Sequence, residues 1–257
     1  MPKHRRIWNA SVYEKYIREG RGCGNGLDYM PWIHVQDFAS RGVVSRVRGR
    51  TTGRVHHLMS NNELAYFYIL DWADKVTDIR EQYPLVDLER AVNIAVQAGI
   101  KYPTDKVSGY PYVLTCDFMI TTEQGQKART IKMSSELSDS RVREKLEIER
   151  RYWLAYGIEW KIVTEREISY RKARNIEWLY TALCCEPADG AVCDTMLHLL
   201  RSSQYSAVEA AQIIECEFSL DAGSGLQLFK QLILNKDIAI DMNEAFDPNS
   251  RVIMEET

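Results

Sequence analysis

The chain has 257 residues, of which 45% are hydrophobic and 27% charged, and its formal net charge is −3. No apolar stretch comes near the roughly 18 residues of a membrane span, and the first residues, MPKHRRIWNA, lack the apolar core of a signal peptide. These features exclude a membrane protein and predict a soluble, cytoplasmic protein. By length it has one large domain or two modest ones, and we favour two.

Cysteine usage and charge distribution narrow the class of partner. Six cysteines include no CxxC pair and no Cys/His spacing typical of zinc, so we expect reduced, structural thiols. Residues 1–57 hold eleven Lys/Arg and four Asp/Glu, a net charge of +7, whereas residues 186–257 hold four and thirteen, a net charge of −9. This polarity predicts a polyanion near the N-terminus and a different partner at the other end. A solvated basic face is the alternative for the N-terminal excess.

The first two thirds of the chain predict alternating helices and strands. Ser60 and Glu63 form an S-x-x-E capping box, Gly125 suits a hairpin turn, and Ser138 is a candidate helix cap. Periodicity and turn residues indicate, in order, a helix over 11–19, extended segments over 32–38 and 43–59, a helix from 60, a strand over 76–85, a helix over 87–99, strands over 112–121 and 127–133, a helix over 138–157 and a strand over 158–164. This order predicts a mixed α/β domain over residues 1–168.

Residues 169–257 predict a second, mainly helical domain. The expected elements are helices over 169–185, 195–203, 207–218 and 226–236 and a strand over 237–242. Two helices across the glycine turn DAGSG, followed by a strand, resemble a winged helix-turn-helix.

The hairpin sets an acid inside one apolar strand and a lysine inside the next. Side chains alternate along a strand, so Thr130 and Lys132 share one face, and pairing that aligns this face with Asp117 brings carboxylate and ammonium together. Glu63 and Phe67 lie four residues apart on the apolar stripe of their predicted helix, so Glu63 points inward. The sequence therefore predicts that Glu63, Asp117 and Lys132 converge.

An Asp and a Glu with retained waters are a typical Mg²⁺ site, and a nearby lysine stabilises charge in phosphodiester hydrolysis. Two alternatives remain open. Glu63 closes only the capping box, or Asp117 and Lys132 form a cross-strand ion pair on a solvated face.

Glu149 is a further acid in an apolar environment. It shares a helical stripe with Leu146 and Trp153, which predicts a buried carboxylate that needs a partner. We interpret it as a residue that supports the metal site; a salt bridge to Arg143 or Arg151 is the alternative.

Several strings resemble TnsA, the endonuclease subunit of heteromeric cut-and-paste bacterial transposons. They are REGRGCGNGLDYMPWIHVQ, TGRVHHLMSNNELAYFYILDW, DIREQYPL, CDFMI, EKLEIERRYW and NIEWLY, which fall between about residues 15 and 181. The resemblance implies a restriction-endonuclease-like core with catalytic residues at Glu63, Asp117 and Lys132. It also implies Mg²⁺, replaceable by Mn²⁺, with further ligands from Thr130 and the carbonyl of Ile131. Thr130 departs from the family, which usually has Gln there.

The resemblance further implies a division of labour. Members of the family cut the 5′ ends of the element on the non-transferred strand, while a TnsB-like DDE transposase cuts and joins the 3′ ends. A TnsC-like AAA+ regulator would dock on the C-terminal domain, and the protein would lie on nucleoid DNA when it acts. An adaptor with a weakened metal site and a free-standing restriction or repair nuclease are the competing hypotheses. The basic N-terminal segment predicts phosphate contacts from Arg46, Arg48, Arg50 and Arg54.

Overall fold

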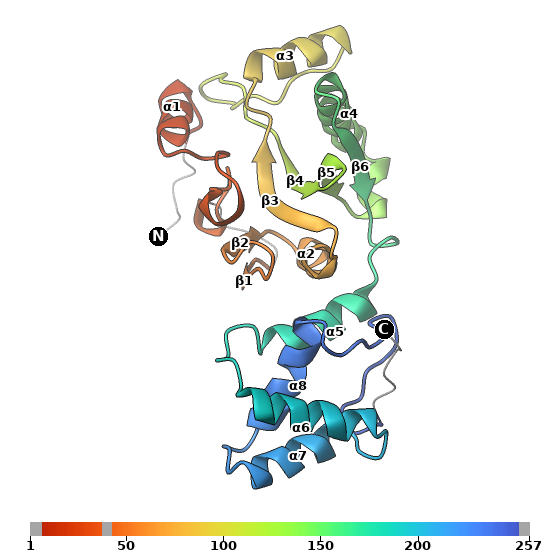
Figure 1. Ribbon diagram of the computed structural model, residues 1–257. Helices are drawn as coiled ribbons and strands as arrows, with labels where there is room; N and C mark the ends of the chain where they lie inside the picture. Colours follow the sequence, from red (N-terminus) through yellow and green to blue (C-terminus); the bar gives the residue numbers. More distant parts are fainter. Residues whose placement is uncertain (1–6, 38–42, 252–257) are drawn as a thin grey trace, which may run out of the picture. The chain divides into compact units, whose positions relative to one another are not determined.

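The computed structural model describes residues 7–37 and 43–251 and divides the chain into two compact units, Met1–Ile168 and Ser169–Thr257 (Figure 1). No helix among the described residues has the length and apolarity that a membrane crossing requires.

A four-stranded mixed sheet is the centre of the first unit. Its strands are β3 (Val76–Pro84), β4 (Thr115–Thr122), β5 (Gly125–Ile131) and β6 (Glu159–Val163), in that spatial order. The first three strands pair antiparallel, and β6 adds to β5 in parallel. The parallel pair needs a crossover connection, which α4 (Ser140–Ala155) provides. The predicted mixed α/β core is confirmed.

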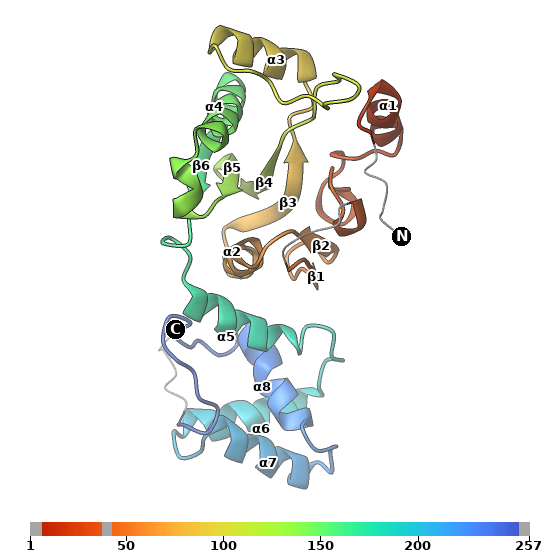
Figure 2. The same ribbon diagram turned by 180° about the vertical axis from the view of Figure 1, so that it is seen from behind.

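The helices of the first unit are α1 (Ala10–Arg18), α2 (Asn61–Trp72), α3 (Leu88–Gln97) and α4, of which α3 and α4 pack against the sheet in its core. Figures 1 and 2 show α3 beside the upper end of α4, and α4 running along β6. Ala95 of α3 and Ile148 of α4 pack with Met119 and Ala128 of the sheet, all fully buried. Burial of this apolar face fixes both helices against the strands.

A two-stranded ribbon precedes α2. It consists of β1 (Ser45–Arg48) and β2 (Val55–Leu58), which pair antiparallel, so the extended segment predicted over 43–59 forms two strands separated by a turn. The extended segment expected over 32–38 is wrong over Val35–Asp37, which forms a short 3-10 helix. Its turn is closed by the carboxylate of Asp37, which accepts a hydrogen bond from the backbone N–H of His34 at 2.9 Å. Residue 38 lies outside the described residues.

The N-terminal cap of α2 is the predicted residue, whereas the cap of α4 lies one residue after the predicted one. The Ser60 hydroxyl accepts a hydrogen bond from the Glu63 N–H and begins α2, as predicted. Asp139, rather than Ser138, caps α4, because its carboxylate accepts from the N–H groups of Arg141 and Val142. Ser138 ends the preceding 3-10 helix.

In the described part of the second unit, residues 169–251, the regular elements are helices joined by turns, and an irregular segment follows the last helix. Its helices are α5 (Tyr170–Tyr180), α6 (Gly190–Arg201), α7 (Ala207–Glu217) and α8 (Ser224–Leu234). The strand predicted over 237–242 is wrong, and no wing of paired strands forms there. Ile238 and Met242 are buried, and the Asn175 side chain donates to the Met242 carbonyl, so the segment is held by helices rather than by a neighbouring strand.

Candidate active site

The hairpin brings Asp117 and Lys132 together. Phe118 pairs with Arg129 across β4 and β5, which sets Asp117 level with Thr130. Lys132 follows the last residue of β5, and its Nζ lies 3.7 Å from Oδ2 of Asp117. The same carboxylate oxygen accepts a hydrogen bond from the Ile131 N–H at 2.6 Å. The predicted alignment of the two faces is therefore confirmed.

Glu63 reaches this region from the first turn of α2. Its carboxylate accepts hydrogen bonds from the Met59 N–H at 2.9 Å and the Ser60 hydroxyl at 3.0 Å. It also accepts from the Gln82 amide at 3.2 Å. The side chain is buried, and its pKa responds to Asp117 and Lys132. The predicted capping box forms only in part, because the Glu63 carboxylate accepts the Met59 N–H and the Ser60 hydroxyl rather than the Ser60 N–H, and the same side chain senses the charges of the hairpin.

The electrostatics of these side chains favour a cation. Burial and then the negative charge of Asp117 raise the pKa of Glu63 far above its ordinary value, and Lys132 only partly opposes this. The charge of Asp117, helped by Glu149 and Glu63, outweighs burial and raises the pKa of Lys132, which keeps the amine charged. Three carboxyl groups therefore share one ammonium, and burial together with mutual repulsion favours a proton on Glu63 and Glu149 where no further cation is present.

Glu149 faces the same cluster from α4. It is 5% exposed, and its carboxylate accepts the Thr130 hydroxyl at 2.6 Å and the Trp160 indole N–H at 3.3 Å. Burial outweighs these hydrogen bonds, and with Asp117 it raises the pKa of Glu149 to about 7. The alternative of a salt bridge is wrong, because Arg151 pairs with Glu147 and the Arg143 guanidinium donates to main-chain carbonyls.

The two further positions implied as metal ligands are both engaged with neighbours. The Thr130 hydroxyl donates to Glu149, and the Ile131 carbonyl accepts a hydrogen bond from Lys132 Nζ at 2.8 Å. A carbonyl oxygen has two lone pairs, so Ile131 can accept from Lys132 and still offer an oxygen to an ion.

The donor set fits a hard divalent cation that keeps water. Over residues 7–37 and 43–251, no three His, Cys, Asp or Glu side chains lie close enough to hold an ion by themselves. Mg²⁺ usually takes one or two carboxylates, several waters and a substrate phosphate, which is compatible with Glu63, Asp117 and the Ile131 carbonyl. The crowding of buried carboxylates is the independent sign that a positive charge belongs here.

The four arginines predicted to contact DNA have different environments. Arg46 and Arg48 are exposed on one face of the ribbon, and neither forms an ion pair with a described residue. Arg50 is tied back, because its guanidinium donates to the Asp71 carbonyl at 3.4 Å. The prediction is wrong for Arg54, which is 7% exposed and ion-paired with buried Glu81.

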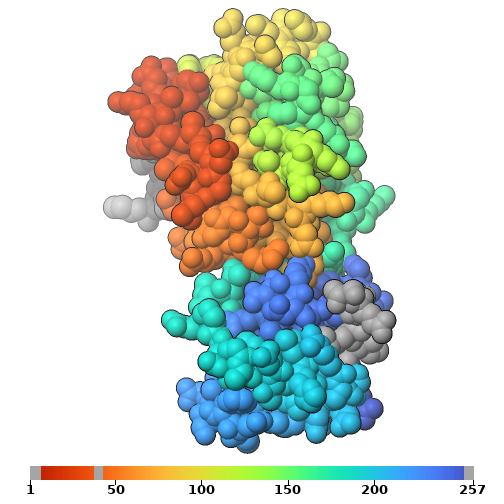
Figure 3. All heavy atoms as spheres, in the orientation of Figure 1, coloured from red at the N-terminus to blue at the C-terminus, as the bar shows by residue number. Residues whose placement is uncertain are grey.

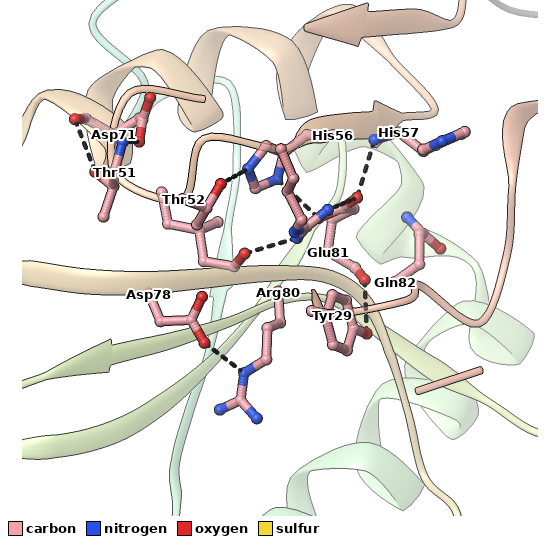
Figure 4. Close-up of polar contacts among 12 residues, drawn as sticks. Tyr29, Thr51, Thr52, His56, His57, Asp71, Asp78, Arg80, Glu81 and Gln82 are labelled. Carbon is pink, nitrogen blue, oxygen red and sulfur yellow. Dashed lines mark hydrogen bonds and ion pairs between the residues drawn. The ribbon is translucent and has the colours of Figure 1, made fainter. Parts of the chain in front are cut away.

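The partner of Arg54 belongs to a buried polar cluster that the sequence did not predict. We call Glu81, Arg54 and His56 the Glu81 cluster (Figure 4). Glu81 accepts from Arg54 Nη1 at 2.8 Å and is 2.8 Å from His56 Nδ1, and it also accepts the His57 N–H at 3.0 Å. Burial alone would raise the pKa of Glu81, but the hydrogen bonds and charges of Arg54 and His56 lower it well below its ordinary value. This cluster ties the ribbon to β3.

Comparison with known proteins gives consistent matches along both units. A family model described as "TnsA-like endonuclease N terminal" matches residues 73–165, and one described as "TnsA endonuclease C terminal" matches residues 167–242. The chain is also 37% identical over 239 residues to "Transposon Tn7 transposition protein TnsA" of Escherichia coli, which covers 91% of this chain and 86% of that relative. Asp117 and Lys132 fall inside the first match, whereas Glu63 precedes it.

Proposed function

Because the chain belongs to the TnsA endonuclease family, with a restriction-endonuclease-like first unit, we propose that it cuts the 5′, non-transferred strands at transposon ends with a divalent metal ion. The observation that carries this proposal is the presence of two buried acids, Glu63 and Asp117, beside Lys132, where burial and mutual repulsion raise the pKa of Glu63 and a divalent cation would relieve both. Such acids suit nuclease chemistry, because they can hold a cation that offsets the negative charge of the scissile phosphate.

The residues divide the task between binding and charge stabilisation. Glu63, Asp117 and the Ile131 carbonyl would hold Mg²⁺ or Mn²⁺, which supplies polarisation of the phosphate and a more acidic water. Lys132 is kept charged beside Asp117 and is held by the Ile131 carbonyl, so its ammonium can stabilise charge that develops on the phosphate. Burial of the two carboxylates lowers the local dielectric and strengthens these interactions, while the partly exposed Lys132 stays accessible to substrate.

Glu149 would act through Thr130 rather than on DNA. Its carboxylate takes the Thr130 hydroxyl, and this hydrogen bond fixes the end of β5 next to Ile131 and Lys132. Groups that orient metal ligands in this way tune affinity without touching substrate.

The exposed face of the ribbon supports a role in DNA binding. Arg46 lies opposite His57 and Arg48 opposite Val55, so both guanidinium groups project from one face. The orange atoms of this part of the chain lie at the surface in Figure 3. β2 ends five residues before Glu63, so DNA held on the ribbon would lie near the cluster. The phosphate backbone is the natural partner of such arginines.

The partners proposed for the complete reaction come from the family. The similar Escherichia coli protein is described as a transposition protein, and we infer that this chain works with a TnsB-like transposase and a TnsC-like AAA+ ATPase on bacterial chromosomal DNA. The net charge of −9 over residues 186–257 favours docking of the second unit on protein, because acidic surface repels phosphate.

One substitution tests the proposal directly. Asp117→Ala should abolish 5′-strand nicking of a transposon-end substrate in the presence of the transposase and the ATPase, while assembly of the complex is retained. Glu123→Ala is the matched control, because this acid is exposed in the turn of the same hairpin. Equal nicking by the wild type and Asp117→Ala would reject the proposal.

The second candidate function is an adaptor that bridges transposase, regulator and DNA without cutting. It is favoured by one observation: the Thr130 hydroxyl donates to Glu149 and accepts the Trp160 indole N–H, which leaves its oxygen a single lone pair for an ion. The adaptor predicts normal assembly and no heat of Mg²⁺ or Mn²⁺ binding in calorimetry. Metal binding that disappears in Glu63→Ala would exclude it.

A further inference from the structure

Gln82 has a backbone conformation that its position does not explain. Its φ is +49°, in the left-handed region that residues with a Cβ rarely adopt. Among described residues, the other non-glycine residues with positive φ are Ser203, Ser219 and Lys236. Each of these lies two residues beyond the end of α6, α7 or α8, where left-handed residues commonly close helices. Gln82 instead lies inside β3 and is 4% exposed.

Neighbouring groups hold this conformation from several sides. The Gln82 carbonyl accepts the Trp32 N–H at 3.3 Å, and its side-chain oxygen accepts the Thr115 hydroxyl at 3.3 Å. Pairing continues on both sides, from Glu81 with Phe118 to Tyr83 with Cys116, so Gln82 stands across from Asp117. A strained residue persists where the surrounding structure over-determines it, and such residues gather at functional sites.

The unusual backbone changes where two consecutive side chains go. Consecutive side chains of a regular strand point to opposite faces. Here Glu81 bonds to Arg54, His56 and the N–H of His57, while Gln82 bonds to Glu63, so both serve the single segment 54–63. Figure 4 shows the side chains of Glu81 and Gln82 beside each other below His56 and His57.

The contact with Glu63 fixes which way the side-chain amide of Gln82 points. A carboxylate can only accept, so the amide NH₂ of Gln82 must face Glu63, and the amide oxygen then meets the Thr115 hydroxyl. Oε2 of Glu63 takes both this amide and the Met59 N–H, and Oε1 takes the Ser60 hydroxyl. Without Gln82, Glu63 would keep only donors from its own helix start. These are local contacts that do not tie it to the sheet that carries Asp117.

We infer that Gln82 is a positioning residue for the metal site: its left-handed backbone and its amide bridge set the carboxylate of Glu63 against the strand that carries Asp117. This inference rests on the proposed function, because it assigns Gln82 a task only if Glu63 binds metal. It adds a residue of β3 to a site otherwise built from α2 and the β4–β5 hairpin.

Calorimetric titration of the full-length chain with Mn²⁺ tests the inference without relying on turnover. Gln82→Leu keeps the size of the side chain but cannot bond to Glu63 or Thr115. Loss of a group that orients a metal ligand costs about tenfold or more in metal affinity, so Gln82→Leu should bind Mn²⁺ about tenfold more weakly. It should also need correspondingly more metal for half-maximal nicking. Thr115→Val, which removes only the outer hydrogen bond, should show a smaller loss of the same kind.

A merely structural role predicts a different result. Gln82→Leu would then lower the melting temperature and leave the Mn²⁺ affinity of the folded protein unchanged, which would overturn the inference. If Gln82→Leu does not fold, Gln82→Gly relieves the backbone strain and also lacks the amide. Wild-type Mn²⁺ affinity in Gln82→Gly would overturn the inference equally.

Glu63→Ala separates this inference from the proposed function. If Glu63→Ala binds Mn²⁺ as tightly as the wild type, the metal site itself is wrong. If Glu63→Ala loses binding while Gln82→Leu retains it, only the role of Gln82 is wrong.

Discussion

Two groups of buried carboxyl groups in the first unit have opposite electrostatic environments. Glu81 is neutralised by Arg54 and His56, and these partners lower its pKa. Glu63 and Glu149 share one ammonium with Asp117, and burial raises the pKa of both. The difference separates an acid that holds the fold together from acids that still lack positive charge.

That difference has a physical basis in desolvation. A buried charge that is paired and fully hydrogen-bonded can be accommodated, whereas like charges crowded in a dry site destabilise one another until a proton or a cation arrives. Burial of an acid is therefore a poor guide to function, and the balance of charge around it is a better one.

The largest expected effect comes from breaking the neutralised cluster. Glu81→Gln leaves the buried Arg54 without a counter-charge and should lower the free energy of unfolding by about 3–5 kcal/mol in urea denaturation. Because the folded pKa of Glu81 is lowered, its contribution is present at pH values above the ordinary glutamate pKa and is lost as pH falls through the folded pKa. Exposed Glu123→Gln is the control, and equal stability of Glu81→Gln and wild type would contradict the comparison.

The next effect is the response of the crowded cluster to metal. Mg²⁺ or Mn²⁺ at about a hundredfold excess over its dissociation constant should stabilise the wild type by about 2.7 kcal/mol, since an ion that binds only the folded state stabilises it by mass action. Thermal denaturation of Asp117→Ala should show no such shift. A similar shift in both proteins would place the ion elsewhere.

A smaller effect distinguishes Glu149 by its pH dependence. Its folded pKa is raised to about 7, so the wild type should lose stability as pH rises through that value in the absence of metal. Glu149→Gln still accepts the Thr130 hydroxyl and should not show this loss, which makes it more stable than wild type by about 1 kcal/mol near pH 8.5. Melting temperatures measured from pH 5.5 to about 8.5 check this; parallel curves for the two proteins would contradict it.

The smallest effect concerns the exposed arginines of the β1–β2 ribbon, which the Glu81 cluster ties to β3. Arg46→Gln with Arg48→Gln should leave stability nearly unchanged and reduce the slope of log affinity for duplex DNA against log salt by about 1.8, or about 0.9 for each phosphate contact. Lys101→Gln with Lys106→Gln removes the same charge from exposed positions in another loop and is the control. An unaltered slope would show that these arginines form a solvated basic face without phosphate contacts.

Local sequence patterns were sufficient to predict much of the site. Alternation along two short strands predicted which faces carry Asp117 and Lys132, and the Ser60 cap predicted where α2 begins, although the Glu63 carboxylate accepts the Met59 N–H rather than the Ser60 N–H that a capping box requires. Period-2 and helical spacing are local properties, so they survive in the structure wherever burial enforces them.

Features that depend on distant partners escaped prediction. Glu81 reads as an exposed charge in DIREQ, and its partner Arg54 is 27 residues away in sequence. Gln82 has no preference for left-handed backbone, so its conformation depends on contacts with Trp32, Thr115 and Glu63. The strand predicted over 237–242 was wrong because alternating burial against helices mimics a sheet edge.

The double attachment of Glu63 limits how this position can evolve. The same carboxylate accepts hydrogen bonds at the start of α2 and belongs to the proposed metal site, so a substitution there would alter helix initiation together with that site. Even an aspartate, one methylene shorter, would have to abandon one of its two tasks. A change at Glu63 therefore affects both roles at once. Natural variants that have lost activity should first carry substitutions at residues that serve only one of these roles.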